Sequence, residues 1–386
     1  MHSSISPKSA NTSHTRADHA LSWLCGALTP NGLDALATEW EDLAQAASEK
    51  NIFQFPKFIR NSLPLLADQE PKIVTVRHSG LLIGIVILRR DMGYAKLPVP
   101  FWKSALHPEQ YLGSPLVRAG FEEEFVTGLT SWLDQASLNC GFVQLAKISG
   151  DGPLAHALFK HSDATGRGII VANRHKRAAI APTARCGTKD DSHLTSSRRK
   201  SIRRAQKRLH NAGEISIERL SERDQLDDWA DQFLEMEDTG WKHEAGSSIL
   251  SCPNETALYR ATIRDSFESG NLTLTRLLMN GKPIAFTLDV LAPPIGYCLK
   301  SAILPEYRKF SAGVLMEFET LKYYLGQGKL DLIDSCTHPD NTMLNELWPD
   351  RREIMDIAVS RRGLIYSSIF AGTRAAKAIM QRFSHV

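Results

Sequence analysis

The hydrophobic pattern of the first half alternates between helical and strand-like spacing. Leu36, Trp40, Leu43 and Ala47 recur three or four positions apart, which predicts a helix over residues 33–48. The same criteria predict a second helix beginning near Pro56, a third helix, and strands on both sides of His78-Ser79-Gly80, a hairpin signal. Their expected ranges are 51–66 and 121–136 for the helices, and 72–76, 81–89 and 141–146 for the strands.

The second half repeats this order. Helices are expected over 224–238 and 256–269, followed by strands over 272–278 and 283–291 around Asn280-Gly281, the strongest short hairpin signal. Two more strands are expected over 297–304 and 330–335. Because each half places a helix pair before a strand, a glycine turn and a strand, we infer an internal duplication of two α/β units.

Length and composition fit this plan. The chain has 386 residues, more than one hydrophobic core usually serves, so two domains are expected over 29–185 and 186–386, after a disordered tail over 1–28. The net charge of +3 is small and does not by itself imply a nucleic-acid or membrane partner. The longest aliphatic run, residues 81–88, is too short to span a bilayer. The six cysteines form no C-x-x-C pair, which favours reduced thiols in the cytoplasm and no metal site.

The stretch "PEYRKFSAG", from Pro305 to Gly313, lies between a predicted strand and a predicted helix. The first turn of a helix has unpaired N–H groups and a partial positive charge, so small residues there are typical of a phosphate site. A tightly packed turn would explain Gly313 equally well. A serine nucleophile at Ser311 is disfavoured, since the motif G-x-S-x-G lacks its first glycine and the loop after the strand is long.

The segment 196–209 carries seven Lys or Arg residues and no acid. Ile202, Ala205 and Leu209 give it a thin apolar stripe, so a helix with a broad basic face is expected. Over 198–208 this face is solvated, contacts the phosphates of a ligand, or makes weak contact with an anionic membrane. No aromatic residues interleave with the charges, which argues against nucleic acid.

Taken in order, the motifs of the second half resemble the BioF2-like/CelD-type branch of the GNAT acyltransferases, which is related to the FemAB peptidoglycan aminoacyltransferases. The elements that carry the resemblance span about residues 194–370: "SSRRKSIRRAQKRLHNAGE", "EDTGWKHEAGSSI", "MNGKPIAFTLDV", "YCLKSAILPEYRKFSAGVLMEFETLKYYLGQG" and "LDLIDSC". The first half looks like the degenerate partner domain of the same family, with "QYLGSPLVRAG" where a phosphate loop would be.

The resemblance implies an α/β fold of two tandem GNAT-like domains, each a mixed, mostly antiparallel sheet flanked by helices. It implies acetyl-CoA or another acyl-CoA as co-substrate, no metal, and transfer of the acyl group to a small-molecule, sugar or lipid-precursor amine by direct attack. The pyrophosphate would lie on the loop formed by Lys309, Phe310, Ser311, Ala312, Gly313 and Val314. The family often has Ser-Pro-Gly where this chain has Ser311-Ala312-Gly313.

Candidate catalytic residues follow the strand 330–335. Asp334 or His338 would accept the proton of the amine, and Cys336 would donate to the leaving sulfur or carry the acyl group. The alternatives are a turn cap for Asp334, a small buried residue for Cys336 and a solvated loop residue for His338. Candidate substrate-binding residues are Trp241, Lys242, Lys300 and Arg351.

Two other functions stay open at this point. A FemAB-type ligase would take its acyl group from aminoacyl-tRNA, and a non-catalytic scaffold would serve polysaccharide or lipid assembly.

Overall fold

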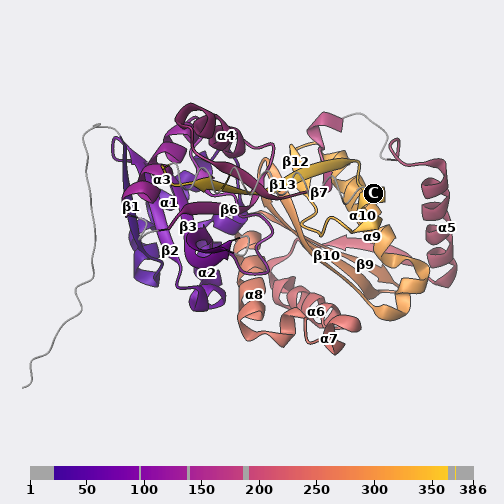
Figure 1. Cartoon of the computed structure of the whole chain (residues 1–386). Helices are drawn as coiled ribbons and strands as arrows, with labels where there is room; N and C mark the ends of the chain where they lie inside the picture. Colours follow the sequence, from indigo (N-terminus) through magenta and orange to yellow (C-terminus); the bar gives the residue numbers. More distant parts are fainter. Residues whose placement is uncertain (1–20, 95–96, 137–139, 186–190, 364–369, 371–386) are drawn as a thin grey trace, which may run out of the picture.

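The computed structural model describes residues 21–94, 97–136, 140–185, 191–363 and 370. One 13-stranded sheet runs through the described part of the chain, with the order β1-β2-β3-β4-β6-β13-β7-β12-β11-β10-β9-β8. Helices cover both faces of this sheet (Figure 1). The order is symmetric about its centre, because each strand of the first half has a counterpart at the same distance from the pair β13 and β7.

The first half opens with a strand and a helix pair, and continues with three antiparallel strands and alternating helices and strands. Its main elements are β1 Leu21–Ala27, α1 Pro30–Ala46, α2 Pro56–Leu66, β2 Lys72–His78, β3 Leu81–Tyr94, β4 Leu97–Ser104, β5 Leu116–Val117, α3 Glu122–Ala136, β6 Phe142–Ser149, α4 Pro153–Thr165 and β7 Ile169–Ile180. Residues 21–27, assigned to the tail by composition, therefore form an edge strand that pairs with β2.

The second half repeats this order after the basic helix α5, Ser196–Ala212. Its main elements are β8 Ile215–Arg219, α6 Leu226–Glu237, α7 Trp241–Glu244, α8 Pro253–Glu268, β9 Leu272–Met279, β10 Lys282–Ala292, β11 Ile295–Ile303, α9 Ala312–Gln327, β12 Leu332–Asp334, α10 Thr342–Leu347 and β13 Asp350–Ser360. The sheet is mixed and mostly antiparallel, since of the paired strands only β4 with β6 and β11 with β12 run parallel.

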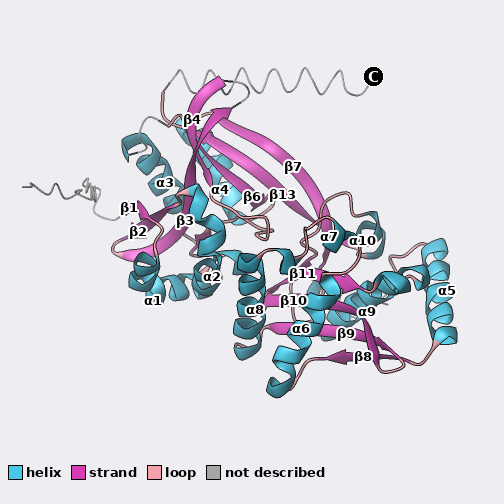
Figure 2. Ribbon diagram, turned by 90° about the horizontal axis from the view of Figure 1, so that it is seen from below, coloured by secondary structure: helices cyan, strands magenta, loops and turns pink. Residues whose placement is uncertain are grey.

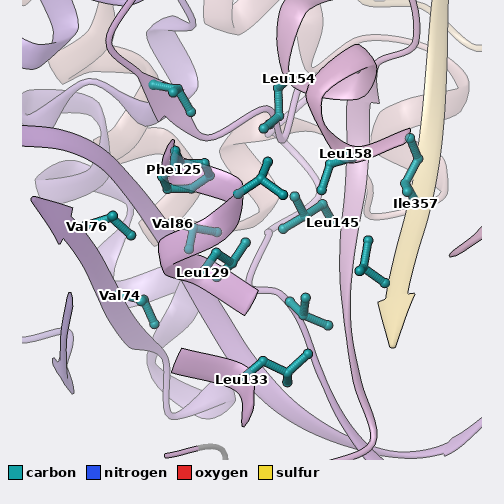
Figure 3. Close-up of a cluster of buried hydrophobic side chains, with 14 of the residues drawn as sticks. Val74, Val76, Val86, Phe125, Leu129, Leu133, Leu145, Leu154, Leu158 and Ile357 are labelled. Atoms are coloured by element: carbon teal, nitrogen blue, oxygen red, sulfur yellow. The ribbon is translucent and has the colours of Figure 1, made fainter. Parts of the chain in front are cut away.

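The two halves share their central strands. β7, from the first half, pairs with β12 of the second, and β13, the last strand described, pairs with both β6 and β7. Ile357 of β13 accordingly packs into the core of the first half beside Leu145 and Leu158 (Figure 3). Each half is thus completed by a strand from the other, and the expected domain boundary near residue 186 does not separate two independent sheets.

A second hydrophobic core also joins the halves. Phe53, Phe58 and Leu112 of the first half pack in one cluster with residues of α6, α8, β10 and β11. α2 and α8 accordingly lie side by side at the centre of the molecule (Figure 2). No helix of the described residues is long and apolar enough to cross a membrane.

We predict that Ile357→Ala destabilises the whole molecule, although the residue lies near the end of the chain. The side chain is fully buried, so its truncation should cost about 2–5 kcal/mol of unfolding free energy. Denaturant unfolding should remain a single transition because the central strands are shared. As a control, Leu24→Ala on the half-exposed face of β1 should change stability by at most about 0.5 kcal/mol. Two separate transitions, only one of them moved by Ile357→Ala, would contradict this picture.

Candidate functional site

The parallel strands β11 and β12 diverge after a short contact. They pair only from Ile295 to Tyr297 against Leu332 to Asp334, while β11 continues to Ile303. β11 also contains a bulge: Leu288 of β10 lies opposite Lys300 and Asp289 opposite Cys298, which leaves Leu299 unpaired. Bulges are frequent beside active sites because they redirect a side chain. The opening between the two strands is the first component of the candidate site.

The N-terminus of α9 forms the second component. The 3-10 turn η6, Pro305–Phe310, leads to Ser311 in a left-handed conformation with φ of 61°, and the first turn of α9 contains no acidic residue. Arg308 and Lys309 are exposed beside it, and Nη2 of Arg208 lies 3.4 Å from Oγ of Ser311. The free amides and the cations together favour an anion at this end of the helix.

Gly313 also lies close to β11. A Cβ at this position would meet Cδ1 of Ile303, the end of a flexible side chain that would have to turn aside. Ala312 is fully buried, whereas Phe310, Ser311 and Val314 are partly buried. Residues 309–314 therefore form a turn at a helix start, with Gly313 close to β11.

The equivalent region of the first half differs in both components. Between β4 and β6 the chain places its own loop, where Gly113 N donates to the Lys147 carbonyl at 2.8 Å and Ser149 N donates to Ser114 Oγ at 3.0 Å. The first turn of α3 carries Glu122, Glu123 and Glu124, which would repel an anion. The stretch "QYLGSPLVRAG" thus fills the opening between the strands instead of forming a phosphate loop.

Asp334 is the centre of a buried ion cluster. Its carboxylate receives two hydrogen bonds of 2.7 Å from Arg177 of β7 and one of 2.7 Å from Arg352 of β13, and Cys336 N adds a fourth at 3.0 Å. Arg352 also pairs with Glu49 of the first half. Burial alone would raise the pKa of Asp334, but the two guanidinium charges outweigh it and lower the pKa. With every oxygen engaged, Asp334 is better suited to holding three strands together than to accepting a proton.

The other two catalytic candidates have different environments, Cys336 buried and His338 exposed. Cys336 is buried, and burial together with the charge of Asp334 raises the pKa of its thiol well above the usual range, which disfavours a nucleophilic thiolate. The side chain of His338 is 77% exposed and lies 3.3 Å from Asp340. The structure therefore does not assemble Asp334, Cys336 and His338 into one reactive group.

Lys300 belongs to a cluster that the sequence analysis missed. Its Nζ lies 3.2 and 3.1 Å from the two oxygens of Glu109, which also accepts hydrogen bonds from the phenols of Tyr111, at 2.6 Å, and Tyr259. Burial alone would raise the pKa of Glu109, but Lys300 and the phenols outweigh it and lower the pKa. Glu109 comes from the loop of the first half, so both halves supply this cluster beside the β11 opening.

A cavity of about 430 Å³ lies between α2 and α8, at the junction of the halves. A smaller cavity shares Phe58 and Thr262 with it and reaches Glu109, Tyr259 and Leu299. The smaller cavity measures only about 10 Å³, room for one water molecule at most, so the Glu109–Lys300 cluster is nearly closed in this structure. Within the described residues no group of three or more His, Cys, Asp or Glu side chains could hold a metal ion.

The remaining substrate-binding candidates contribute little to this site. Trp241 and Lys242 begin the short helix α7, and their side chains lie outside the described residues. Arg351 donates to the carbonyl oxygens of Trp348, at 2.9 Å, Asp350, at 2.6 Å, and Asn345. Its guanidinium therefore fixes the turn between α10 and β13, away from the Glu109–Lys300 cluster.

The repeated order of elements, the diverging parallel strands and the helix start after β11 define a tandem fold of the GNAT acyltransferase type. Residues 196–341 match the family model described as "Acetyltransferase (GNAT) domain". They therefore form a GNAT domain, the fold of acyltransferases. No curated protein matches the chain in sequence.

Solved structures match most of the chain, including the first half. FemX is 12% identical, with 87% of this chain and 96% of that chain covered and a TM-score of 0.53. A conserved protein of unknown function from Bacteroides thetaiotaomicron is 11% identical, with 88% and 99% covered and a TM-score of 0.52. A tandem GNAT protein from the clavulanic acid biosynthesis pathway is 13% identical, with 89% and 99% covered and a TM-score of 0.41. At these identities the first two matches establish a FemAB-related GNAT fold and leave the reaction open.

We predict that Asp334→Asn strongly destabilises the protein, because it leaves Arg177 buried without its counter-charge and Arg352 with Glu49 alone. Breaking a buried pair of this kind costs about 3–5 kcal/mol, measurable by denaturant unfolding. Since the folded-state pKa of Asp334 is lowered, its contribution is present above the unfolded pKa of about 3.9 and is lost as pH falls through the folded value. The matched control is Asp340→Asn, whose side chain is 88% exposed. If both variants lowered the unfolding free energy equally, the ion cluster around Asp334 would not be important for stability.

A second prediction concerns the carboxyl of Glu317, which lies on the buried face of α9, one turn after Gly313. Burial and the nearby charge of Asp289 raise its pKa to about 8, so the group is mostly protonated at neutral pH. Because the unfolded group ionises first, the stability of the natural protein relative to Glu317→Gln should fall between about pH 4.5 and pH 8 and then level. Thermal unfolding of both proteins across this range measures the difference. A constant difference would mean that Glu317 is already ionised in the folded protein.

Proposed function

We propose that the protein is an acyl-CoA-dependent N-acyltransferase that moves an acyl group from a CoA thioester to an amine. The observation that carries the proposal is the contrast between the halves. The second half has an open strand pair and a helix start surrounded by cations, whereas the first half has a filled opening and three glutamates at the equivalent helix start. A polyanionic donor fits only the second.

The residues around α9 suit the phosphates of CoA. The amides of the first turn would take the pyrophosphate, and Arg208, Arg308 and Lys309 supply positive charge on the same side. The basic helix α5 contributes here because it packs against α9 and η6. The acyl arm would follow β11 toward its bulge, where the strands separate and the backbone is no longer fully paired.

The chemistry needs a neutral amine on the opposite side of the opening. As the amine attacks, a C–N bond forms, the C–S bond breaks, the sulfur leaves as thiolate and the nitrogen loses a proton. We assign the proton acceptor to Glu109, which is ionised at neutral pH and borders a small cavity of about 10 Å³ beside β11. Lys300 and the two phenols hold this carboxylate in place. Asp334 takes a positioning role in this scheme.

The first experiment measures the binding of acetyl-CoA and of longer acyl-CoAs to the protein by titration calorimetry. Lys309→Glu reverses a charge beside the α9 amides without touching the core, and we expect about tenfold weaker binding, or ~1.4 kcal/mol. The control Lys282→Glu changes an equally exposed lysine at the β9–β10 turn and should bind as the natural protein does.

A parallel titration with aminoacyl-tRNA tests the other donor. Binding of charged tRNA without binding of any acyl-CoA would replace the proposal by a tRNA-dependent transfer. Binding of neither would favour a non-catalytic role.

A further inference from the structure

The basic helix α5 has two sides of opposite character. Its apolar stripe is buried in one cluster with residues of β9, β10 and α9. Four basic residues recur three or four positions apart and therefore lie together on the side of the helix opposite this stripe. All four are exposed, and they form what we call the outward face: Lys200, Arg203, Arg204 and Lys207.

The cations of the outward face lack counter-charges. None of their side chains has an ion pair or a hydrogen bond with another described residue. On the inner side of the same helix, by contrast, Arg198 pairs with Glu346 at 3.1 Å. Exposed arginines of other helices also have acidic partners, as Arg60 of α2 and Arg260 of α8 do. The outward face therefore differs from the usual surface arginine of this chain.

This arrangement of charges works against the helix itself. Residues three or four positions apart are neighbours on a helix surface, so each such pair on the outward face is like-charged and repels. The 17 residues of α5 include no acid that could relieve the repulsion. Arg198 and Arg199 also stand in the first turn, where the helix dipole favours acids. An anionic partner offsets both costs, whereas a merely solvated helix has no need of this pattern.

The position of α5 indicates what kind of partner can reach it. In both views the helix lies at the outer end of the second half, with α9 on its inner side (Figure 1, Figure 2). Its four outward cations extend over about 10 Å along a convex helix surface. α5 contains no Phe, Tyr or Trp that could stack on bases. A convex row of cations at the end of the molecule fits a flat layer of phosphates better than a folded nucleic acid.

We propose that the outward face of α5 binds the protein to a membrane surface rich in anionic phospholipids. The four cations contact lipid phosphates, while the apolar stripe stays in the core of the protein. Attachment is electrostatic and reversible, because the outward face has no apolar side chain to enter the acyl chains. This binding does not depend on the proposed function, which uses Arg208, Arg308 and Lys309 beside the start of α9.

The test is co-sedimentation of the full chain with vesicles. One set contains phosphatidylglycerol and phosphatidylcholine in equal parts, and the other contains phosphatidylcholine alone. We expect binding to the anionic vesicles only, at about 0.1 M salt, and loss of binding at about 1 M, where the screening length falls to about 3 Å. The double variant Lys200→Gln/Lys207→Gln should bind about thirtyfold more weakly, since each cation near an anionic surface contributes about fivefold, or ~1 kcal/mol.

The matched control is the double variant Lys57→Gln/Lys160→Gln. It removes two exposed lysines from α2 and α4 of the first half, so both double variants lower the net charge equally. The control should bind anionic vesicles as the natural protein does, and circular dichroism checks that both variants fold. Absence of binding to anionic vesicles overturns the inference, as does equal binding to neutral vesicles or binding that Lys200→Gln/Lys207→Gln leaves unchanged.

Two further titrations separate this inference from its alternatives. Tighter binding of transfer RNA than of anionic vesicles, weakened by Lys200→Gln/Lys207→Gln, would replace the membrane by nucleic acid. If the same variant weakens acyl-CoA binding and spares vesicle binding, the outward face belongs to the donor site and the inference is wrong. Vesicle binding by a protein that binds no acyl-CoA supports the inference and overturns the proposed function alone.

Discussion

The buried carboxylate of Asp334 is the constraint on which the rest of the structure depends. It joins β12 to Arg177 of β7 and Arg352 of β13, and through Arg352 to Glu49 of the first half. Desolvating these charges is costly, and the hydrogen bonds among them offset this cost, although Arg352 Nε has no partner among the described residues. Because β7 pairs with β12 and β13 pairs with β6 and β7, this cluster fixes the strand register where the sheets of the two halves join. The opening between β11 and β12 begins at Asp334, the last residue of β12.

The two halves share a plan but have different surfaces at equivalent positions. In the second half, the start of α9 lacks acids and the strands remain open. In the first half, the loop that fills the opening sends Glu109 and Tyr111 across to Lys300 and Tyr259. The loop therefore closes the opening between β4 and β6, and it supplies Glu109 and Tyr111 to the cluster around Lys300. This exchange explains why a half without a phosphate site still matters for the proposed reaction.

Local patterns predicted most of the long helices, the two hairpins and the loop before α9, because these depend on residues close in sequence, but they did not predict α4. They could not predict the role of Asp334, whose partners lie 157 and 18 residues away, or the pairing of Glu109 with Lys300 across 191 residues. β13 was missed for a related reason. Its start, "DRREIM", reads as solvated, yet Arg352 and Glu353 are buried because Asp334, Glu49 and Arg174 neutralise them.

The bulge at Leu299 links the fold to the proposed chemistry. In a regular strand Lys300 would alternate with Leu299 and face α9, as Cys298 does. The extra residue turns both Leu299 and Lys300 toward α8, where Leu299 joins the core with Tyr259 and Lys300 meets Glu109. An ammonium facing α9 would lie near the buried carboxyl of Glu317 and behind the helix start that suits phosphates. The bulge therefore places the proposed donor site at α9 and the proposed proton acceptor Glu109 on opposite sides of one strand.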